Sequence, residues 1–237
     1  MTRVPAALPA QTVRWHVFPD DASLVANALA RVMAAGRDAI AQHGAFDIVL
    51  AGGNTPRKLY RALRNADADW SRWHVWFGDE RCAPPDDPAR NSKMARVEWL
   101  DHVAVPAGNV HAIPAESGAR EAAAVYAREL RGADTFDIVL LGLGEDGHTA
   151  SLFPGRDWGV HEDSPDALAV FDAPKPPPER VSLSTHRLSN ASNVLFLVEG
   201  AGKRDAVAAW KQGEAIPAAS IAPRAGVDVL LDAAAAM

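Results

Sequence analysis

The sequence has little cysteine, no long apolar run and no excess of positive charge, and each shortage excludes a class of protein. Cys82 is the only cysteine in 237 residues, so neither an internal disulfide nor a cysteine-based zinc site can form. No stretch approaches the ~20 apolar residues that a membrane-spanning helix needs, and residues 1–15 lack the apolar core of a leader. The net charge of −6 gives no broad field that would attract polyanions. We therefore expect a cytoplasmic protein that binds neither membranes nor nucleic acid.

The histidines also lack the spacing of a metal site. Eight are present, and the seven other than His148 show no H-x-x-x-H pattern and no cluster with acids of the kind that metal sites need. We therefore expect no bound metal.

Strand-like and helix-like patterns alternate along the chain. Expected strands cover 12–18, 46–50, 73–81, 109–113, 136–141, 167–173, 181–184, 193–200 and 227–232, and expected helices cover about 21–44, 56–63, 92–102, 117–132 and 201–210. Asp20 or Asp21 is the expected cap of the first helix, and Ser117 that of the fourth. Such alternation predicts an α/β fold with three layers, in which helices flank a mostly parallel central sheet. We expect one domain over 1–237, with the proline-rich pieces as loops.

The stretch 136–155, FDIVLLGLGEDGHTASLFPG, is the most informative part of the sequence. An apolar run that ends in a glycine-rich turn is typical of a buried parallel strand that delivers polar groups to the edge of a sheet. Its first five residues repeat those of 46–50. This recurrence predicts two central strands built alike, each followed by a glycine turn.

Gly142, Gly144 and Gly147 match the dinucleotide-binding pattern G-x-G-x-x-G. The turn, however, contains two acids that would face a pyrophosphate, and Pro154 comes too soon for the long helix that the pattern requires. We therefore reject a dinucleotide site and interpret the glycines, Gly144 among them, as allowing a tight turn and the close approach of a smaller ligand.

His148 directly follows this turn and is the candidate catalytic base. Asp146, two residues earlier, can accept a hydrogen bond from the imidazole and raise its basicity. The nucleophile pattern G-x-S-x-G is absent, so we interpret Ser151 as structural and water as the partner of His148.

Two other strand ends carry candidate binding residues. The segment GGNTP supplies free N–H groups, a hydroxyl and a helix start, which together form a cradle for an anion or a sugar hydroxyl; its residues are Gly52, Gly53, Asn54 and Thr55. The acids and the arginine of 79–81 follow an aromatic strand. Asp79 and Arg81 are candidate substrate contacts, because guanidinium recognises phosphate with paired donors.

Three further residues are candidates for substrate binding. Lys203 is expected in the first turn of a helix, where a cation opposes the macrodipole unless it binds an anion. Arg180, before VSLS, is another possible anion contact. Asn91 is either a loop tether or a ligand for a sugar hydroxyl, and the sequence leaves both open.

Taken together, GGNTP, FGDER, the later Asn91-x-x-Met94, GLGEDGHTASLFPG, RVSLS and GAGK resemble the 6-phosphogluconolactonase family, in that order, over roughly 13–232. The resemblance implies a Rossmann-like fold and hydrolysis of 6-phospho-D-glucono-1,5-lactone to 6-phosphogluconate in the oxidative pentose phosphate pathway. By position, His148 would be the base, Asp146 its support, and Arg81 and Lys203 the phosphate contacts. Lactone opening requires no metal and no organic cofactor. The expected partner is this small sugar phosphate, and the expected state is a monomer or weak homo-oligomer.

Two alternatives remain. A glucosamine-6-phosphate deaminase or isomerase shares the GG-x-TP and DGH elements, but carries an acid shortly after the histidine where this chain has 150–154, ASLFP. A non-catalytic sugar-phosphate sensor would need the cations but not the base. Retention of His148 and Asp146 favours the lactonase.

Overall fold

The structure, a computed structural model, describes residues 10–237, so residues 1–9 of the segment predicted to lack a leader core lie outside the described residues. The strands are β1 (Val13–Phe18), β2 (Phe46–Leu50), β3 (Trp73–Phe77), β4 (Asp79–Arg81), β5 (Val110–His111), β6 (Phe136–Gly142), β7 (Ala167–Val170), β8 (Arg180–Leu183), β9 (Ala191–Val198) and β10 (Val227–Asp232). The helices are α1 (Asp21–His43), α2 (Asn54–Leu63), α3 (Asn91–Glu98), α4 (Ala119–Glu129), α5 (Thr185–Ser189), α6 (Arg204–Lys211), α7 (Pro217–Ser220) and α8 (Ala233–Ala236).

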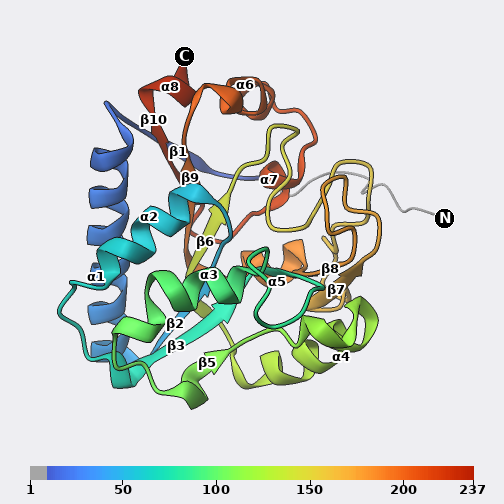
Figure 1. Ribbon diagram of the computed structural model, residues 1–237. Helices are drawn as coiled ribbons and strands as arrows, with labels where there is room; N and C mark the ends of the chain where they lie inside the picture. Colours follow the sequence, from blue (N-terminus) through green and yellow to red (C-terminus); the bar gives the residue numbers. More distant parts are fainter. Residues whose placement is uncertain (1–9) are drawn as a thin grey trace.

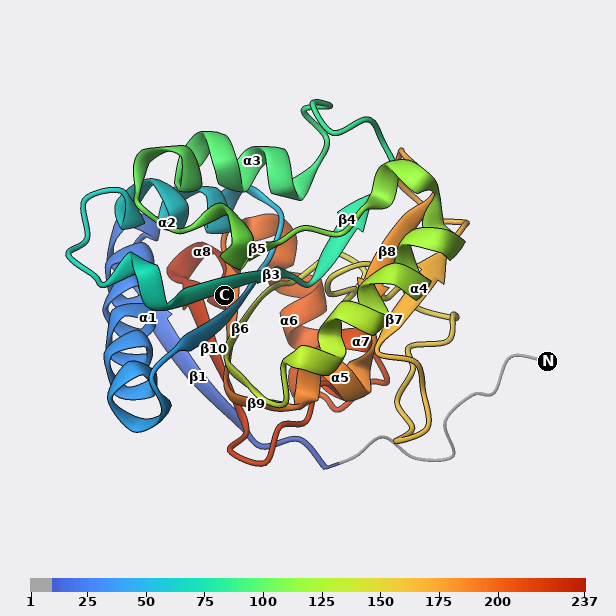
Figure 2. The same cartoon turned by 90° about the horizontal axis from the view of Figure 1, so that it is seen from below.

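A seven-stranded sheet with the order β1-β10-β9-β6-β2-β3-β5 forms the middle layer, and all its pairings are parallel. Figures 1 and 2 show α1, α2 and α3 on one face of this sheet and α4 to α7 on the other. The predicted three-layer α/β fold is confirmed. β6 is the central strand, and six of its seven residues are buried because helices cover both faces.

The order of the strands creates a crevice between β2 and β6. The chain leaves β2 through α2 towards β3, whereas it leaves β6 in the opposite direction towards β9. Where connections from two adjacent parallel strands diverge, a gap opens at their carboxyl ends, and ligands of open α/β sheets bind there.

The longest helix begins and ends where its sequence predicts. The carboxylate of Asp20 accepts a hydrogen bond from the backbone N–H of Ser23 at 2.8 Å, which caps the N-terminus of α1. Gly44 ends the helix in the left-handed conformation, with φ of 89°. The predicted cap Ser117 is wrong: α4 starts after Gly118 without a side-chain cap, and the Ser117 hydroxyl donates to the carbonyl of Pro114.

The expected strand over 73–81 is wrong as a single element. It divides at Gly78, and β4 leaves the main sheet to pair antiparallel with β8. β8 also pairs with β7, so β4, β8 and β7 form a second, three-stranded sheet that the sequence patterns did not indicate. The helix expected over 92–102 is also shorter, because the α-helical part of α3 ends at Glu98.

The buried side chains form one hydrophobic cluster that reaches from Leu24 in α1 to Ala235 in α8. A shared core agrees with the single-domain assignment of 1–237, which stays a prediction. Among residues 10–237, no helix is long and apolar enough to cross a membrane.

Candidate active site

A cleft of about 330 Å³ lies at the carboxyl ends of β2 and β6, in the crevice that the strand order creates. Its walls come from the turns after both strands, from the β3–β4 corner and from the loop before β8. The lining residues are Leu50, Ala51, Gly52, Gly53, Gly78, Asp79, Arg81, Leu140, Leu141, Gly142, Leu143, Gly144, His148, Thr149, Ala150, Lys175, Pro176, Arg180 and Lys203.

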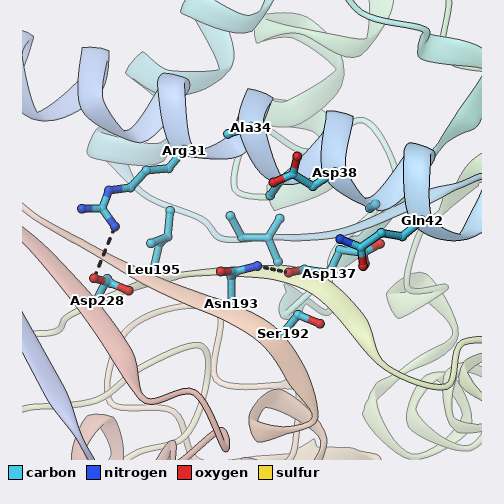
Figure 3. Close-up of a pocket in the computed structure, with 12 residues that line it drawn as sticks. Arg31, Ala34, Asp38, Gln42, Asp137, Ser192, Asn193, Leu195 and Asp228 are labelled. Carbon is cyan, nitrogen blue, oxygen red and sulfur yellow. Dashed lines mark hydrogen bonds and ion pairs between the residues drawn. The ribbon is translucent and has the colours of Figure 1, made fainter.

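A second hollow, of about 320 Å³, lies at the opposite edge of the sheet between α1 and the first residues of β6, β9 and β10 (Figure 3). Three of its charged groups are engaged with the protein: Arg31 forms an ion pair with Asp228 at 3.3 Å, and Asp137 accepts from the imidazole of His43 at 3.0 Å. None of the predicted site residues lines it. The candidate site is therefore the cleft at the carboxyl ends.

The turn after β6 brings His148 and Asp146 together as predicted. The imidazole Nδ1 and the carboxylate Oδ1 are 2.5 Å apart, and the same oxygen accepts from the backbone N–H of His148 at 3.1 Å. An ionised carboxylate can only accept, so Nδ1 carries the proton and Nε2 has the free lone pair. The imidazole is therefore arranged to accept a proton through Nε2.

Asp146 is held in its ionised form. Its burial by itself raises the pKa of the carboxyl, but the hydrogen bonds from the side chain and backbone of His148 outweigh that effect, and the pKa lies below its usual value. Phe153 packs against the imidazole, with 4.8 Å between ring centroids. The imidazole of His148 is thus held by Asp146 through a hydrogen bond and by Phe153 through ring packing.

Glycine is required at position 144, for a reason that differs from the predicted one. A Cβ added to Gly144 would lie 2.0 Å from Nδ1 of His148, so the imidazole occupies the space of the missing side chain. The Gly144 N–H donates to the carbonyl of His148 at 2.7 Å, which closes the turn. Gly144 does line the cleft, but the close approach that it allows is to the catalytic histidine.

Only the two glycines of the GGNTP segment line the cleft, and the segment continues into α2. Gly52 and Gly53 line the cleft, whereas Asn54 and Thr55 form the start of α2 and do not. Thr55 is buried and makes no capping hydrogen bond. The N–H groups of Gly52 and Gly53 have no hydrogen-bond partner among residues 10–237. These two amides are therefore free to donate to a ligand.

Asp79 forms the buried floor of the cleft and connects three segments. Its Oδ2 accepts from the hydroxyl of Ser151 at 2.6 Å, and its Oδ1 accepts from the side-chain amide of Asn91 at 2.8 Å. Asn91 does not line the cleft, and its Oδ1 fills the space where a side chain at Gly52 would lie. The structure therefore gives Asn91 a tethering role. The hydrogen bond of Ser151 agrees with the interpretation of that residue as structural.

Glu80 is a positioning residue that sequence reasoning did not identify. It is fully buried, and its carboxylate accepts from the backbone N–H groups of Arg81, Asn91 and Ser92 at 2.7–2.8 Å. The guanidinium of Arg90 lies 3.3 Å from it. Glu80 thus joins the two ends of the loop between β4 and α3.

Three predicted cations converge on the cleft. The Nη1 of Arg81 donates to the carbonyl of Ala89, and its Nε is buried without a partner in the described part of the chain. Burial lowers the pKa of Arg180 and of Lys203 below their usual values. Lys203 lies immediately before α6, at the end of a short 3-10 helix, and not inside the first turn of that helix as predicted.

Sequence reasoning missed Lys175, which also lines the cleft. It lies in the proline-rich segment before Arg180, which the sequence analysis treated only as a loop. A lysine between prolines near a candidate anion ligand was the available signal. No group of three potential metal-ligating side chains occurs among the residues that the structure describes.

The fold and the cleft define the class of protein. It is a doubly wound parallel α/β protein with an enzyme-like cleft at a topological switch point, in which a carboxylate–histidine pair faces several cations. The chain belongs to the family described as glucosamine-6-phosphate isomerases/6-phosphogluconolactonase, whose model matches residues 19–230.

Two relatives and one solved structure that the chain resembles are lactonases by name. The chain is 38% identical to the 6-phosphogluconolactonase of Nostoc sp., over 93% of this chain and 95% of the relative. It is 40% identical to that of Mycobacterium leprae, over 89% and 90% of the two chains. The crystal structure of 6-phosphogluconolactonase from Thermotoga maritima superposes with a TM-score of 0.86 at 26% identity, covering 93% of this chain and all of that one.

Proposed function

We propose that this protein hydrolyses 6-phospho-D-glucono-1,5-lactone to 6-phospho-D-gluconate, the second step of the oxidative pentose phosphate pathway. The observation that carries the proposal is the 2.5 Å contact between Asp146 and Nδ1 of His148, which leaves Nε2 as a proton acceptor in a cleft lined by cations. The names of the relatives in the same family support the choice of substrate.

In the proposed reaction His148 activates water. Nε2 takes a proton as the water oxygen bonds to the lactone carbonyl carbon, and the carbonyl oxygen becomes an oxyanion. Collapse of this intermediate breaks the bond to the ring oxygen, which receives the proton back from the imidazolium as it leaves as a hydroxyl. Asp146 stabilises the imidazolium between the two steps.

The oxyanion is assigned to the turn after β2. The N–H groups of Gly144, Gly147 and His148 are already bonded within their own turn. The N–H groups of Gly52 and Gly53 are free, line the same cleft and are the proposed donors.

The phosphate is assigned to the cationic side of the cleft. Arg81, Arg180 and Lys203 line it, and a bound dianion would offset the cost of their partial burial. Asp79 lines the floor and is the proposed contact for a sugar hydroxyl. Held at both ends, the lactone carbonyl would be placed for attack by the activated water.

The test compares His148→Ala with the matched control His161→Ala, which removes an exposed histidine outside the cleft. Acid release from fresh 6-phosphogluconolactone above its spontaneous rate should fall roughly 10²–10⁴-fold in the first variant and not in the second. Ammonia release from glucosamine 6-phosphate by the same wild-type sample would instead indicate a deaminase. Wild-type lactone hydrolysis by His148→Ala would show that the mechanism is wrong.

The cytoplasmic location and the monomeric or weakly associating state stay predictions. Analytical ultracentrifugation across a range of concentrations would test the second.

A further inference from the structure

We propose that Lys175, at the tip of the proline-rich loop between β7 and β8, is a further phosphate-binding residue of this cleft, and that Arg180 positions it. The proposal rests on the proposed function and names an additional ligand for the same anion. Lys175 lines the cleft together with Arg81, Arg180 and Lys203.

Hydrogen bonds to its own backbone carbonyls hold the loop that carries Lys175. Arg180 donates from Nη2 to the carbonyl of Lys175 at 2.8 Å and from Nε to the carbonyl of Pro177 at 3.2 Å. The N–H of Ala173 donates to the carbonyl of Pro178 at 3.0 Å, which closes the loop at its base. Prolines also flank Lys175 on both sides and restrict its backbone before any ligand binds.

The ammonium of Lys175 has no partner of its own in residues 10–237: it forms neither an ion pair nor a hydrogen bond there. It lies close enough to Lys203 to help lower the pKa of that lysine, although burial lowers it more, and Glu145 and Asp146 both raise it. The two like-charged ammonium groups repel each other, while Glu145 and Asp146 attract Lys203. A phosphate dianion removes that repulsion.

Arg180 therefore has two tasks. Two of its nitrogens hold the loop, while the residue itself still lines the cleft beside Lys175. This arrangement explains why a guanidinium with so little exposure, 5%, forms no salt bridge with a carboxylate in the described chain. The positive charge of Arg180 contributes to the cleft, and its hydrogen bonds hold the backbone of the loop that carries Lys175.

The experiment measures binding of 6-phosphogluconate by isothermal titration calorimetry to the full chain. Lys175→Met should weaken binding about tenfold and raise KM, with kcat within about twofold of wild type, because one charge-assisted contact is lost away from the reacting carbonyl. Lys175→Arg should recover most of the affinity. The matched control Lys211→Met removes a lysine that lies over Trp15, outside the cleft, and should bind as wild type does.

Wild-type affinity in Lys175→Met would overturn the proposal, and so would an equal loss in Lys211→Met, which would indicate a general charge effect. A wild-type chain that binds 6-phosphogluconate without hydrolysing the lactone would refute the proposed function alone. In that case the comparison of Lys175→Met with wild type still decides the role of Lys175.

Discussion

The hydroxyl of Tyr60 fixes the main chain just before the Gly52–Gly53 turn, and its removal gives a quantitative prediction. It accepts from the N–H of Ala51 at 3.0 Å and donates to the carbonyl of the same residue at 2.7 Å. Tyr60 is fully buried, and burial raises the pKa of its hydroxyl above the usual value, so the group stays neutral in this role. Tyr60→Phe deletes both bonds and leaves the ring in place.

The expected cost follows from the two backbone groups left without partners. Ala51 is buried, so its N–H and its carbonyl have little access to water even though the residue lines the cleft. An unsatisfied buried polar group costs roughly 1–3 kcal/mol, which gives a loss of about 3 kcal/mol in the free energy of unfolding. For a chain of this size that corresponds to a decrease in Tm of roughly 6–12 °C.

The assay is thermal and urea unfolding followed by circular dichroism, with kcat and KM measured on the folded fraction at 25 °C. The chain offers a matched variant, Tyr126→Phe, because the Tyr126 hydroxyl makes the same pair of bonds to Phe77 at the end of β3. Both variants should lose similar stability. Only Tyr60→Phe should also impair catalysis, since Ala51 precedes the proposed oxyanion donors. A Tyr60→Phe protein that melts within about 1 °C of wild type would refute the reasoning on unsatisfied groups.

Three further predictions concern the site and its surroundings. Gly144→Ala should reduce kcat by at least about 10²-fold, because the new Cβ would displace the imidazole of His148, and steady-state kinetics would show it. Glu98→Gln should destabilise the protein at pH 7, and this loss should shrink as the pH falls through the folded-state pKa of Glu98, as measured by urea unfolding, because the hydrogen bond from Arg61 lowers that pKa. Cys82 should react slowly with a disulfide reagent at pH 8, since burial raises its pKa to about 11.

Each of these has a control. Gly108→Ala adds a methyl group where nothing lies within 4 Å and should leave kcat unchanged; an equal loss there would contradict the displacement of His148. For Glu98, the lowered folded-state pKa gives stabilisation that is present above the unfolded-state pKa and is lost as the pH falls through the folded-state value. A stability difference that stays constant from pH 7 through the whole acid range would contradict the ionic origin. Fast modification of Cys82 in the folded protein would contradict the raised pKa of its partly buried thiol.

The sequence predicted best those features that depend on local pattern. The cap at Asp20 or Asp21, the helix end near Gly44 and the apolar run of β6 each follow from a few neighbouring residues, and the structure confirms them, with Asp20 as the cap. The contact between Asp146 and His148 was also predictable, because two residues in one turn reach each other without any contribution from the rest of the fold.

Features that depend on distant segments were not predictable. The strand pattern of 73–81 gives no sign that the chain breaks at Gly78, because β4 exists only where β8 is available to pair with it, about one hundred residues later. Lys175 reaches the cleft through the hydrogen bonds of Arg180 to its loop, and no periodicity in the sequence reports those bonds. The burial of Glu80 likewise depends on Arg90 and on the start of α3.

The repeated FDIVL segments acquire a physical meaning from the pairing of β2 with β6. Ile48 lies opposite Ile138 and Val49 opposite Val139, so the repeats are neighbours in exact register. β6 is two residues longer than β2, but Gly52 and Gly142 hold the same position relative to the two repeats, and a Cβ on Gly142 would lie 4.0 Å from the carbonyl oxygen of Gly52. The sheet thus delivers the free amides of one turn and the imidazole of the other to the same cleft, as the proposed attack on a carbonyl requires.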